Sequence, residues 1–198
     1  EANLTKLFQL LTVPLFEVRM LVQEAIISYS GLSFSKEMLI EFLSEPGSSF
    51  NYLLYEVLVD FWDGDKYDCY KFLLSRVSTD TEESNNYVYR ALMKLSIPEV
   101  LKFFHKELRN TIEHPNPLVI RYLGKSRYAL AFLDVFSLLD HDNINVVEAA
   151  LDALLEFKDE IIIPKIIGLL LSFKNLSIMR KSIEILSPTP NFSRFLYI

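Results

Sequence analysis

Apolar residues recur at helical spacing along nearly the whole chain, in stripes separated by short polar segments. The first stripes are Leu4, Leu7, Phe8 and Leu11, and then Val18, Val22, Ala25, Ile26 and Tyr29. Spacings of three and four residues place such side chains on one face of an α-helix, and no sustained alternation of period two interrupts them. Only five glycines occur among 198 residues, which is too few for the many tight turns of an all-β fold. The sequence therefore predicts an all-α protein.

The polar segments between the stripes contain the residues that begin and end helices. Examples are residues 44–49, 63–65, 114–117 and 140–143, which are rich in Asp, Asn, Ser, Pro and Gly. Asp, Asn and Ser cap helix N-termini, whereas Pro and Gly stop helices. Because short helices joined by short turns run antiparallel, the pattern predicts a series of helix hairpins.

The predicted hairpins align on one apolar anchor in each second helix. Apolar or small residues follow four, seven and eight positions after the anchor, except that Arg127 stands at the seventh position of the fourth unit. The six anchors are Val18, Phe50, Tyr89, Ile120, Val146 and Ile178. They lie 26 to 39 residues apart, so six units of about 33 residues use the whole chain.

The last two units have a characteristic order of residues. One has an apolar first helix over 162–171 with Pro164 near its start, followed by a second helix that begins at 177–180. The other has an Asp-rich turn at 140–142, followed by Val and Ala pairs over 146–150. In this order the chain resembles the HEAT-repeat family, most closely over residues 131–188. The resemblance implies a right-handed α-solenoid of about six antiparallel helix hairpins.

One hairpin cannot bury both of its apolar faces, so stacked neighbours must share a continuous core. We therefore expect residues 1–198 to form a single HEAT-like repeat domain. A terminal repeat needs a polar outer face, yet residues 192–198 are mostly apolar. This end is therefore expected to contact a partner or to continue into a further repeat of a longer chain.

In HEAT-like solenoids the second helices line the concave face, so this resemblance indicates where a partner would bind. The fifth and sixth positions after each anchor are expected to point away from the core. They are Gln23 and Glu24, Tyr55 and Glu56, Lys94 and Leu95, Lys125 and Ser126, Leu151 and Asp152, and Ile183 and Glu184. Lys94 and Lys125, with Arg90 and Arg121 nearby, predict a basic saddle that binds an acidic peptide or a phosphate group. An ordinary solvated face is the alternative.

Two further segments bear on partner binding. Basic residues are frequent between 102 and 127, which supports the saddle; they are Lys102, Lys106, Arg109, Arg121, Lys125 and Arg127. Residues 52–89 are rich in Tyr and acidic side chains, and Tyr52, Tyr55, Glu56 and Trp62 are candidates for a second partner surface. Packing between adjacent hairpins explains these aromatic residues equally well.

Charge and cysteine content limit the compartment and the partners. The formal net charge is −6, which disfavours binding to nucleic acid or to an anionic membrane over the whole surface. Cys69 is the lone cysteine, so no internal disulfide forms, as is usual in the reducing cytoplasm. The longest apolar run, 161–173, is too short and too interrupted to span a bilayer. We expect a cytoplasmic protein without a transmembrane segment.

Motifs for catalysis are not found in the sequence. It contains no Gly-rich phosphate loop, nucleophile elbow or zinc-protease motif, and its histidines lack metal-ligand spacing. Residues 63–65 look like a calcium loop but lack its spacing, so a turn is expected. The sequence thus predicts a non-catalytic protein-binding scaffold without cofactor or metal. The alternatives are an enzyme on a HEAT-like scaffold, such as a DNA glycosylase or a bilin lyase, and a structural segment of a larger helical assembly.

Overall fold

The computed structural model describes residues 54–60, 62–77, 82–172 and 175–187, together with residues 6, 10, 18, 21, 22, 25 and 40. These residues form helices, turns and connecting segments, with no strand among them, so the all-α prediction is confirmed. Most of the first two predicted hairpins, Tyr52 and the apolar segment 192–198 lie outside the described residues.

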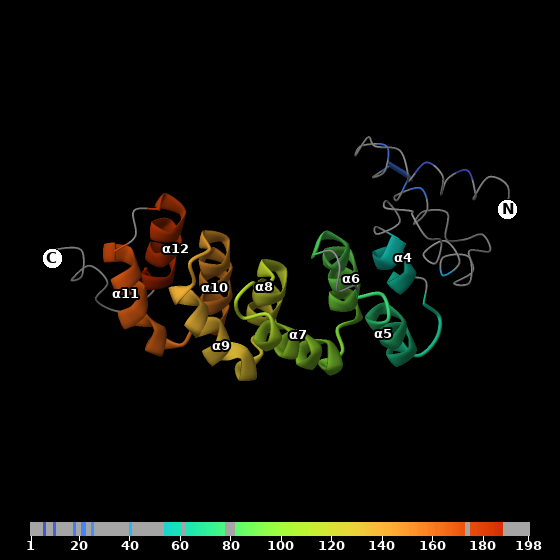
Figure 1. Cartoon of the computed structure of the whole chain (residues 1–198), viewed down its shortest axis with the longest axis horizontal. Coiled ribbons are helices and arrows are strands. Elements are labelled where there is room, and N and C mark those ends of the chain that lie inside the picture. Colours follow the sequence, from blue (N-terminus) through green and yellow to red (C-terminus); the bar gives the residue numbers. More distant parts are fainter. Residues whose placement is uncertain are drawn as a thin grey trace. The chain divides into compact units, whose positions relative to one another are not determined.

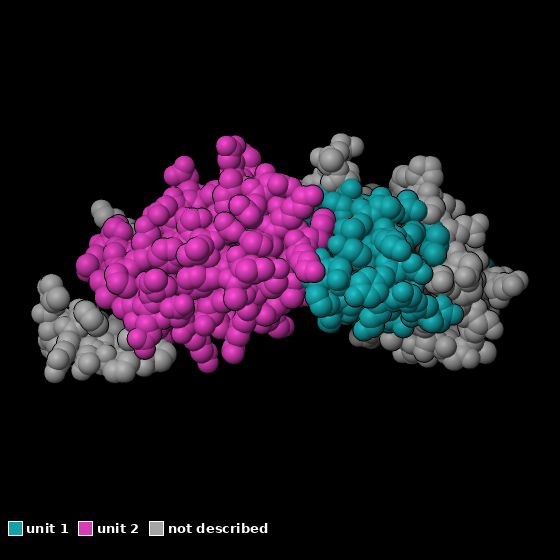
Figure 2. All heavy atoms as spheres, turned by 90° about the horizontal axis from the view of Figure 1, so that it is seen from below, with its two compact units in different colours: residues 1–100 teal, residues 101–198 magenta. Residues whose placement is uncertain are grey.

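The chain divides into two compact units, residues 1–100 and 101–198 (Figure 2). Unit 1 includes the helices α4 (Leu54–Asp60), α5 (Lys66–Leu74) and α6 (Glu82–Leu95). Helix α6 packs against both α4 and α5. Their shared core includes the fully buried Leu58, Cys69 and Leu92, so Cys69 serves as a small apolar core residue.

Helix α7 (Pro98–Asn110) contains the division between the units, and the other helices of the described chain follow it in unit 2. They are α8 (Pro117–Lys125), η2 (Ala129–Ala131), α9 (Phe132–Ser137), η3 (Leu138–Asp140), α10 (Ile144–Phe157), η4 (Glu160–Ile162), α11 (Ile163–Ser172) and α12 (Leu176–Leu186). Helix α10 packs against α8, α9 and α12, and α11 packs against α12. Within this unit α8, α10 and α12 form one row and α9 and α11 a second (Figure 1).

The helices of the first row begin in the same way. Asn116, Asn143 and Asn175 are the N-caps of α8, α10 and α12, and each side chain accepts a hydrogen bond of 2.9 Å from the backbone N–H two residues later. Each cap thus satisfies one of the backbone donors that a helix start leaves without a partner. The turns predicted at 114–117 and 140–143 therefore contain helix starts, as expected.

Buried residues that follow these caps refine the repeat. Three positions after each Asn stands a buried apolar residue, namely Val119, Val146 or Ile178. The anchor of the fourth unit is thus Val119, one residue before the predicted Ile120, although Ile120 is also buried. The shift arises because α8 buries two consecutive apolar residues, and the sequence alone does not say which of them begins the stripe.

Second helices also end in a repeated way. Ser96, Arg127 and Lys158 follow α6, α8 and α10 and have left-handed backbone conformations, with φ of 52°, 48° and 56°. Successive members of this series lie 31 residues apart. Because non-glycine residues seldom adopt positive φ, three such residues at one spacing indicate a repeated hairpin unit.

The first helices keep the same spacing in their cores. Val100, Ala131 and Ile162 stand four residues after the three left-handed positions, and all are buried. Phe104, Val135 and Ile166 stand eight residues after them and are fully buried. Residues 96–166 thus repeat a buried pattern with a period of 31 residues. The complete six-hairpin solenoid, as one domain over residues 1–198, stays a prediction.

Gly124 marks the closest approach between α8 and α10. A Cβ atom added there would lie 2.3 Å from the Cα of Ala153 and 2.4 Å from its Cβ. These distances are far below van der Waals contact, so only glycine fits opposite Ala153 without a shift of one helix. The two small residues allow the most extensive helix contact of unit 2.

Candidate anion-binding site

The four predicted saddle cations are all exposed. Arg90 and Lys94 lie one turn apart on α6, and Arg121 and Lys125 lie one turn apart on α8. The first pair belongs to unit 1 and the second to unit 2. Each pair presents its charges on one helix face, because residues four apart are neighbours on an α-helix. A saddle that combines all four residues stays a prediction.

Two of these cations make ion pairs within their own unit. Lys94 Nζ lies 2.7 Å from Asp60 Oδ2 and also donates to the Glu56 carbonyl oxygen at 3.3 Å. Arg121 Nε lies 2.9 Å from Asp152 Oδ2, and Lys181 pairs with the other oxygen of the same carboxylate. These pairs connect α4 to α6, and α8 to α10 and α12, so they offset charge that the saddle needs for a ligand.

The predicted aromatic surface is largely internal. Tyr55 is 6% exposed, so the prediction that its ring is available to a partner is wrong. Trp62 is half-buried, its indole N–H donates to the Asp65 carbonyl oxygen at 3.0 Å, and its ring lies 6.1 Å from that of Phe72. Glu56 is half-buried as well. Burial therefore accounts for Tyr55, and contacts with Asp65 and Phe72 account for Trp62.

Residues 63–65 form the expected turn, because the Asp65 side chain caps α5 by accepting a hydrogen bond from the Tyr67 N–H at 3.0 Å. In the described part of the chain no cluster of His, Cys, Asp and Glu could hold a metal ion.

The fifth and sixth positions after each anchor do not all point away from the core. Leu151 and Leu95 are buried, like Tyr55, which contradicts the prediction for these positions. Helices α6 and α10 have neighbours on several sides, so their buried arcs are wider than the stripe facing one partner. Lys125 and Glu184 are exposed as predicted.

A different basic surface lies on α7. Lys102, Lys106 and Arg109 are spaced by four and three residues and are exposed, so they share one helix face. Phe104 and Leu108 are buried on the opposite face. Helix α7 is thus amphipathic, with an apolar side in the core and a cationic side toward solvent.

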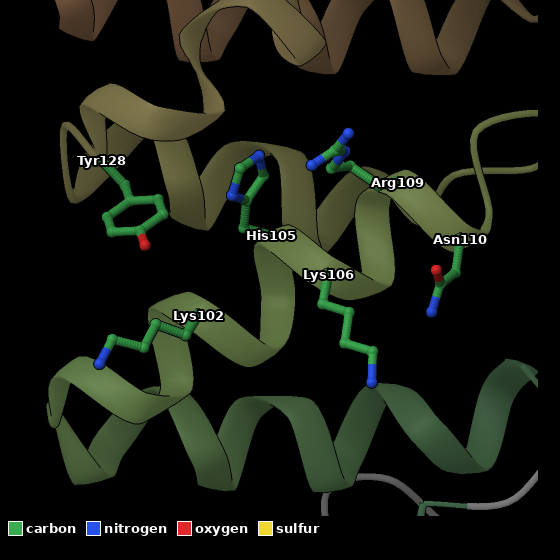
Figure 3. Close-up of a pocket in the computed structure, with 6 residues that line it drawn as sticks. All are labelled: Lys102, His105, Lys106, Arg109, Asn110 and Tyr128. Atoms are coloured by element: carbon green, nitrogen blue, oxygen red, sulfur yellow. The ribbon is translucent and has the colours of Figure 1, made fainter.

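The cationic side of α7 borders a hollow of about 470 Å³ in unit 2. The residues that line it are Lys102, His105, Lys106, Arg109, Asn110 and Tyr128, hereafter the α7 cleft. In Figure 3 His105 and Arg109 rise from the helix on the side of Tyr128, and Lys106 and Asn110 extend to the opposite side. The polar side chains of the cleft are thus divided between two sides of α7.

His105 is held in place from two sides. Its Nε2 lies 2.6 Å from Asp134 Oδ2, and its ring meets Tyr128 edge to face with centroids 5.7 Å apart. Arg109 Nε lies 3.9 Å from the same carboxylate oxygen. The His105 side chain is only 16% exposed, so this contact connects α7 to α9 and fixes the imidazole at the wall of the cleft.

The α7 cleft has more positive than negative charge. Asp134 is the carboxylate that pairs with its lining residues, whereas Lys102 and Lys106 have no ion-pair partner among the residues that the structure describes. Lysine and arginine side chains in such a hollow bind carboxylate or phosphate oxygens through charge-assisted hydrogen bonds. The described lining includes no Ser, Thr or Cys, and its hydroxyl belongs to Tyr128, whose ring packs edge to face with that of His105.

The buried face of α7, opposite its cations, packs against α8. Tyr122 of α8 meets Phe104 of α7 edge to face, with ring centroids 5.5 Å apart. Burial raises the pKa of the Tyr122 hydroxyl, an effect that a hydrogen bond with Ser126 opposes. The helix that displays the cations is therefore anchored by its buried face on α8.

A second hollow of about 340 Å³ lies beside α11 and is lined in part by Asp140, His141 and Lys165. Two of its charged groups already have a partner, since Lys165 pairs with Asp140, and the third, Asp142, is a carboxylate that would repel an anion. His141 Nδ1 accepts from the Asn143 N–H at 2.9 Å, and its Nε2 lies 3.0 Å from the Glu113 carbonyl oxygen. These groups stabilise the turn before α10 and leave less charge available for a ligand than the α7 cleft does.

Sequence reasoning found part of the α7 cleft. The basic stretch between 102 and 127 includes Lys102, Lys106 and Arg109, and their helical spacing could have placed them on one face. Tyr128 and Asp134 reach this face only through the fold, because Asp134 is 29 residues from His105 in sequence. No local motif indicates that contact.

No protein-family model, curated protein or solved structure matches the chain. Among its described residues, no helix combines the length and apolarity needed to cross a bilayer.

Proposed function

We propose that this chain is a non-catalytic, HEAT-like α-solenoid scaffold that binds an acidic segment of a partner protein in the α7 cleft. The 31-residue series of left-handed helix ends and the matching buried positions support a repeated hairpin architecture. Stacked hairpins commonly present extended surfaces that bind other proteins. The architecture supports a binding role, and the cleft indicates the chemistry of the ligand.

The observation that carries the proposal is the uncompensated charge of the cleft. Lys102, Lys106 and Arg109 line one hollow, and Asp134, the carboxylate that faces them, is already bound to His105. The whole chain has a net charge of −6, so this local positive region differs in sign from the average surface. Such a region attracts an acidic partner and fixes its orientation more than it adds raw affinity.

Protein is a better match than nucleic acid. A nucleic-acid groove needs several cations along a backbone and aromatic faces on which bases stack. Tyr128 is half-buried and packs edge to face with His105, so it offers no open stacking platform.

The enzyme alternative has one observation in its favour, the His105–Asp134 pair. Such a pair activates a nucleophile when a hydroxyl or thiol stands within hydrogen-bond reach of the imidazole. Since the described lining offers neither Ser, Thr nor Cys, the pair better suits a positioning role. We therefore assign His105 to the wall of a binding site.

The proposal is tested by fluorescence anisotropy with a labelled, Glu-rich peptide at several salt concentrations. We expect salt-dependent binding, weakened about tenfold or more by Lys102→Glu/Lys106→Glu, which corresponds to at least about 1.4 kcal/mol. The matched control is Arg90→Glu/Lys125→Glu, which changes net charge equally at exposed positions outside the cleft. Equal losses in both variants, or a wild-type chain that does not bind the peptide, would contradict the proposal.

A further inference from the structure

We infer that the occupant of the α7 cleft is an amphipathic acidic segment, whose apolar side chains rest on Leu130 and Leu133 while its carboxylates meet Lys102 and Lys106. This inference rests on the proposed function and specifies its ligand. It depends on an exposed apolar strip that continues the cationic face of α7, and the described contacts of unit 2 do not cover that strip.

The strip begins at the rim of the cleft. Leu130 is 70% exposed and Leu133 is 71% exposed. They are three residues apart at the start of the first helix of their hairpin, so they lie on one face. Leu130 follows the cleft residue Tyr128 by two positions, and Leu133 directly precedes Asp134, which binds His105.

The 31-residue repeat indicates that this strip and the cationic face are equivalent surfaces. Lys102, Leu133 and Pro164 each stand six residues after a left-handed position, and all three are exposed. They therefore occupy one repeat position on the solvent side of three successive first helices. At this position the side chain changes from a cation on α7 to apolar groups on α9 and α11.

The strip continues into the next hairpin. Leu130 and Ile161 both stand three residues after a left-handed position, and Ile161 is 65% exposed. Single exposed apolar residues are ordinary on protein surfaces. Here two successive repeats have apolar side chains at the same two exposed positions, so these side chains form a row. The His105–Asp134 contact joins that row to α7.

A ligand that satisfies both surfaces needs carboxylates beside apolar side chains. An acidic amphipathic helix has this composition, because residues three and four apart place the two kinds of group on adjoining faces. An anionic bilayer also combines charge with hydrocarbon, but stacked helix hairpins commonly bind protein segments, and the test below separates the two.

The test uses the full chain and two labelled peptides of equal length and equal negative charge. One has leucines on the face beside its carboxylates, and the other has serines in their place. The wild-type chain is expected to bind the leucine peptide about tenfold more tightly, because burying even part of two leucine side chains supplies that difference. Leu130→Ser/Leu133→Ser should abolish this preference and leave binding of the serine peptide unchanged.

The matched control is Leu171→Ser/Leu176→Ser, which removes side chains that are 79% and 83% exposed on α11 and α12. This variant should keep the preference of the wild type, and thermal melts of both variants should stay near that of the wild type because the changed residues are exposed.

The outcomes separate this inference from the function on which it rests. If both peptides bind equally well through Lys102 and Lys106, the inference is wrong and the proposed function stands. If neither peptide binds, both are wrong. Binding to vesicles of phosphatidylcholine and phosphatidylserine that depends on Leu130 and Leu133, without preference for the leucine peptide, would overturn the inference in favour of a membrane surface.

Discussion

Unit 2 has two groups of cations near its surface, and their surroundings differ. On the row of α8, α10 and α12, Arg121 and Lys181 share the carboxylate of Asp152. On α7, Lys102 and Lys106 have no such partner among the described residues. The first group connects neighbouring helices, and the second faces a hollow. Cations near the surface of unit 2 therefore have two roles. Those paired with a carboxylate of the same chain connect helices, and those without such a partner can contact a ligand.

Substitutions in the two groups of cations should therefore have different effects. Changes in the row of α8, α10 and α12 should alter the free energy of unfolding and leave ligand binding alone. Substitutions of the cations in the α7 cleft should weaken ligand binding and leave the free energy of unfolding nearly unchanged, because these cations contribute few contacts to the fold.

Gly124→Ala is expected to have the largest effect on stability. The added methyl would lie 2.3 Å from the Cα of Ala153, so α8 and α10 must separate, at a cost of about 1–3 kcal/mol. Gly168→Ala in α11 is the matched control, since its methyl meets nothing within 4 Å and should stabilise the helix by about 0.5–1 kcal/mol. Urea unfolding measures both, and a stabilised Gly124→Ala variant would contradict the described contact of α8 with α10.

Asp152→Asn should have a smaller effect on stability. It leaves Arg121 and Lys181 without their shared anion, and we expect a loss of about 1 kcal/mol or less because all three groups are partly exposed. The loss should shrink as salt concentration rises, since salt screens exposed charges. Acidic-peptide binding should not change, and a binding defect in this variant would remove the distinction between the two groups.

Asp134→Asn removes a carboxylate from the other group, and its main effect should be on binding. The cleft loses its negative charge, so affinity for an acidic peptide is expected to rise about two- to fivefold at low salt. Anisotropy titration measures this change beside the Asp152→Asn variant as control. Weaker binding would mean that the position of His105 matters more than the charge that Asp134 contributes.

The smallest expected effect concerns Tyr122, which packs between the two regions. Burial raises the pKa of its hydroxyl in the folded chain, so the folded state favours the protonated form. The protonated hydroxyl of Tyr122 contributes its full stability below the unfolded pKa of 10.0. This contribution is lost as pH rises through the higher pKa of the folded chain. Unfolding measured between neutral pH and pH values above 10 should therefore show a shallower decline for Tyr122→Phe than for the wild type.

Much of the fold could be predicted from local sequence. The helical spacing of apolar residues gave the all-α class, and the Asn and Pro residues at 114–117 located the start of α8. The helix ends were harder, because a left-handed end is usually signalled by glycine. Here Ser96, Arg127 and Lys158 occupy those positions, so the 31-residue period is clear in the backbone and hidden in the residue types.

The candidate site was less predictable. Exposure at one helix position depends on how many neighbours surround that helix, and Leu151 is buried because α10 has neighbours on several sides. Whether a cation has a partner depends on contacts between residues about 30 positions apart, such as Arg121 with Asp152. Sequence spacing therefore identified basic residues, but the fold decided which of them remain available.

We propose that the cations of the α7 cleft, unlike those on the row of α8, α10 and α12, are available to an acidic ligand. Backbone amide chemical-shift mapping by NMR with an acidic peptide tests this most directly. We expect salt-sensitive shifts at Lys102, Lys106, Arg109 and Tyr128, with little change at Arg121 or Lys181. Shifts that concentrate on Arg121 and Lys125, or that are spread evenly over all exposed lysines and arginines, would contradict it.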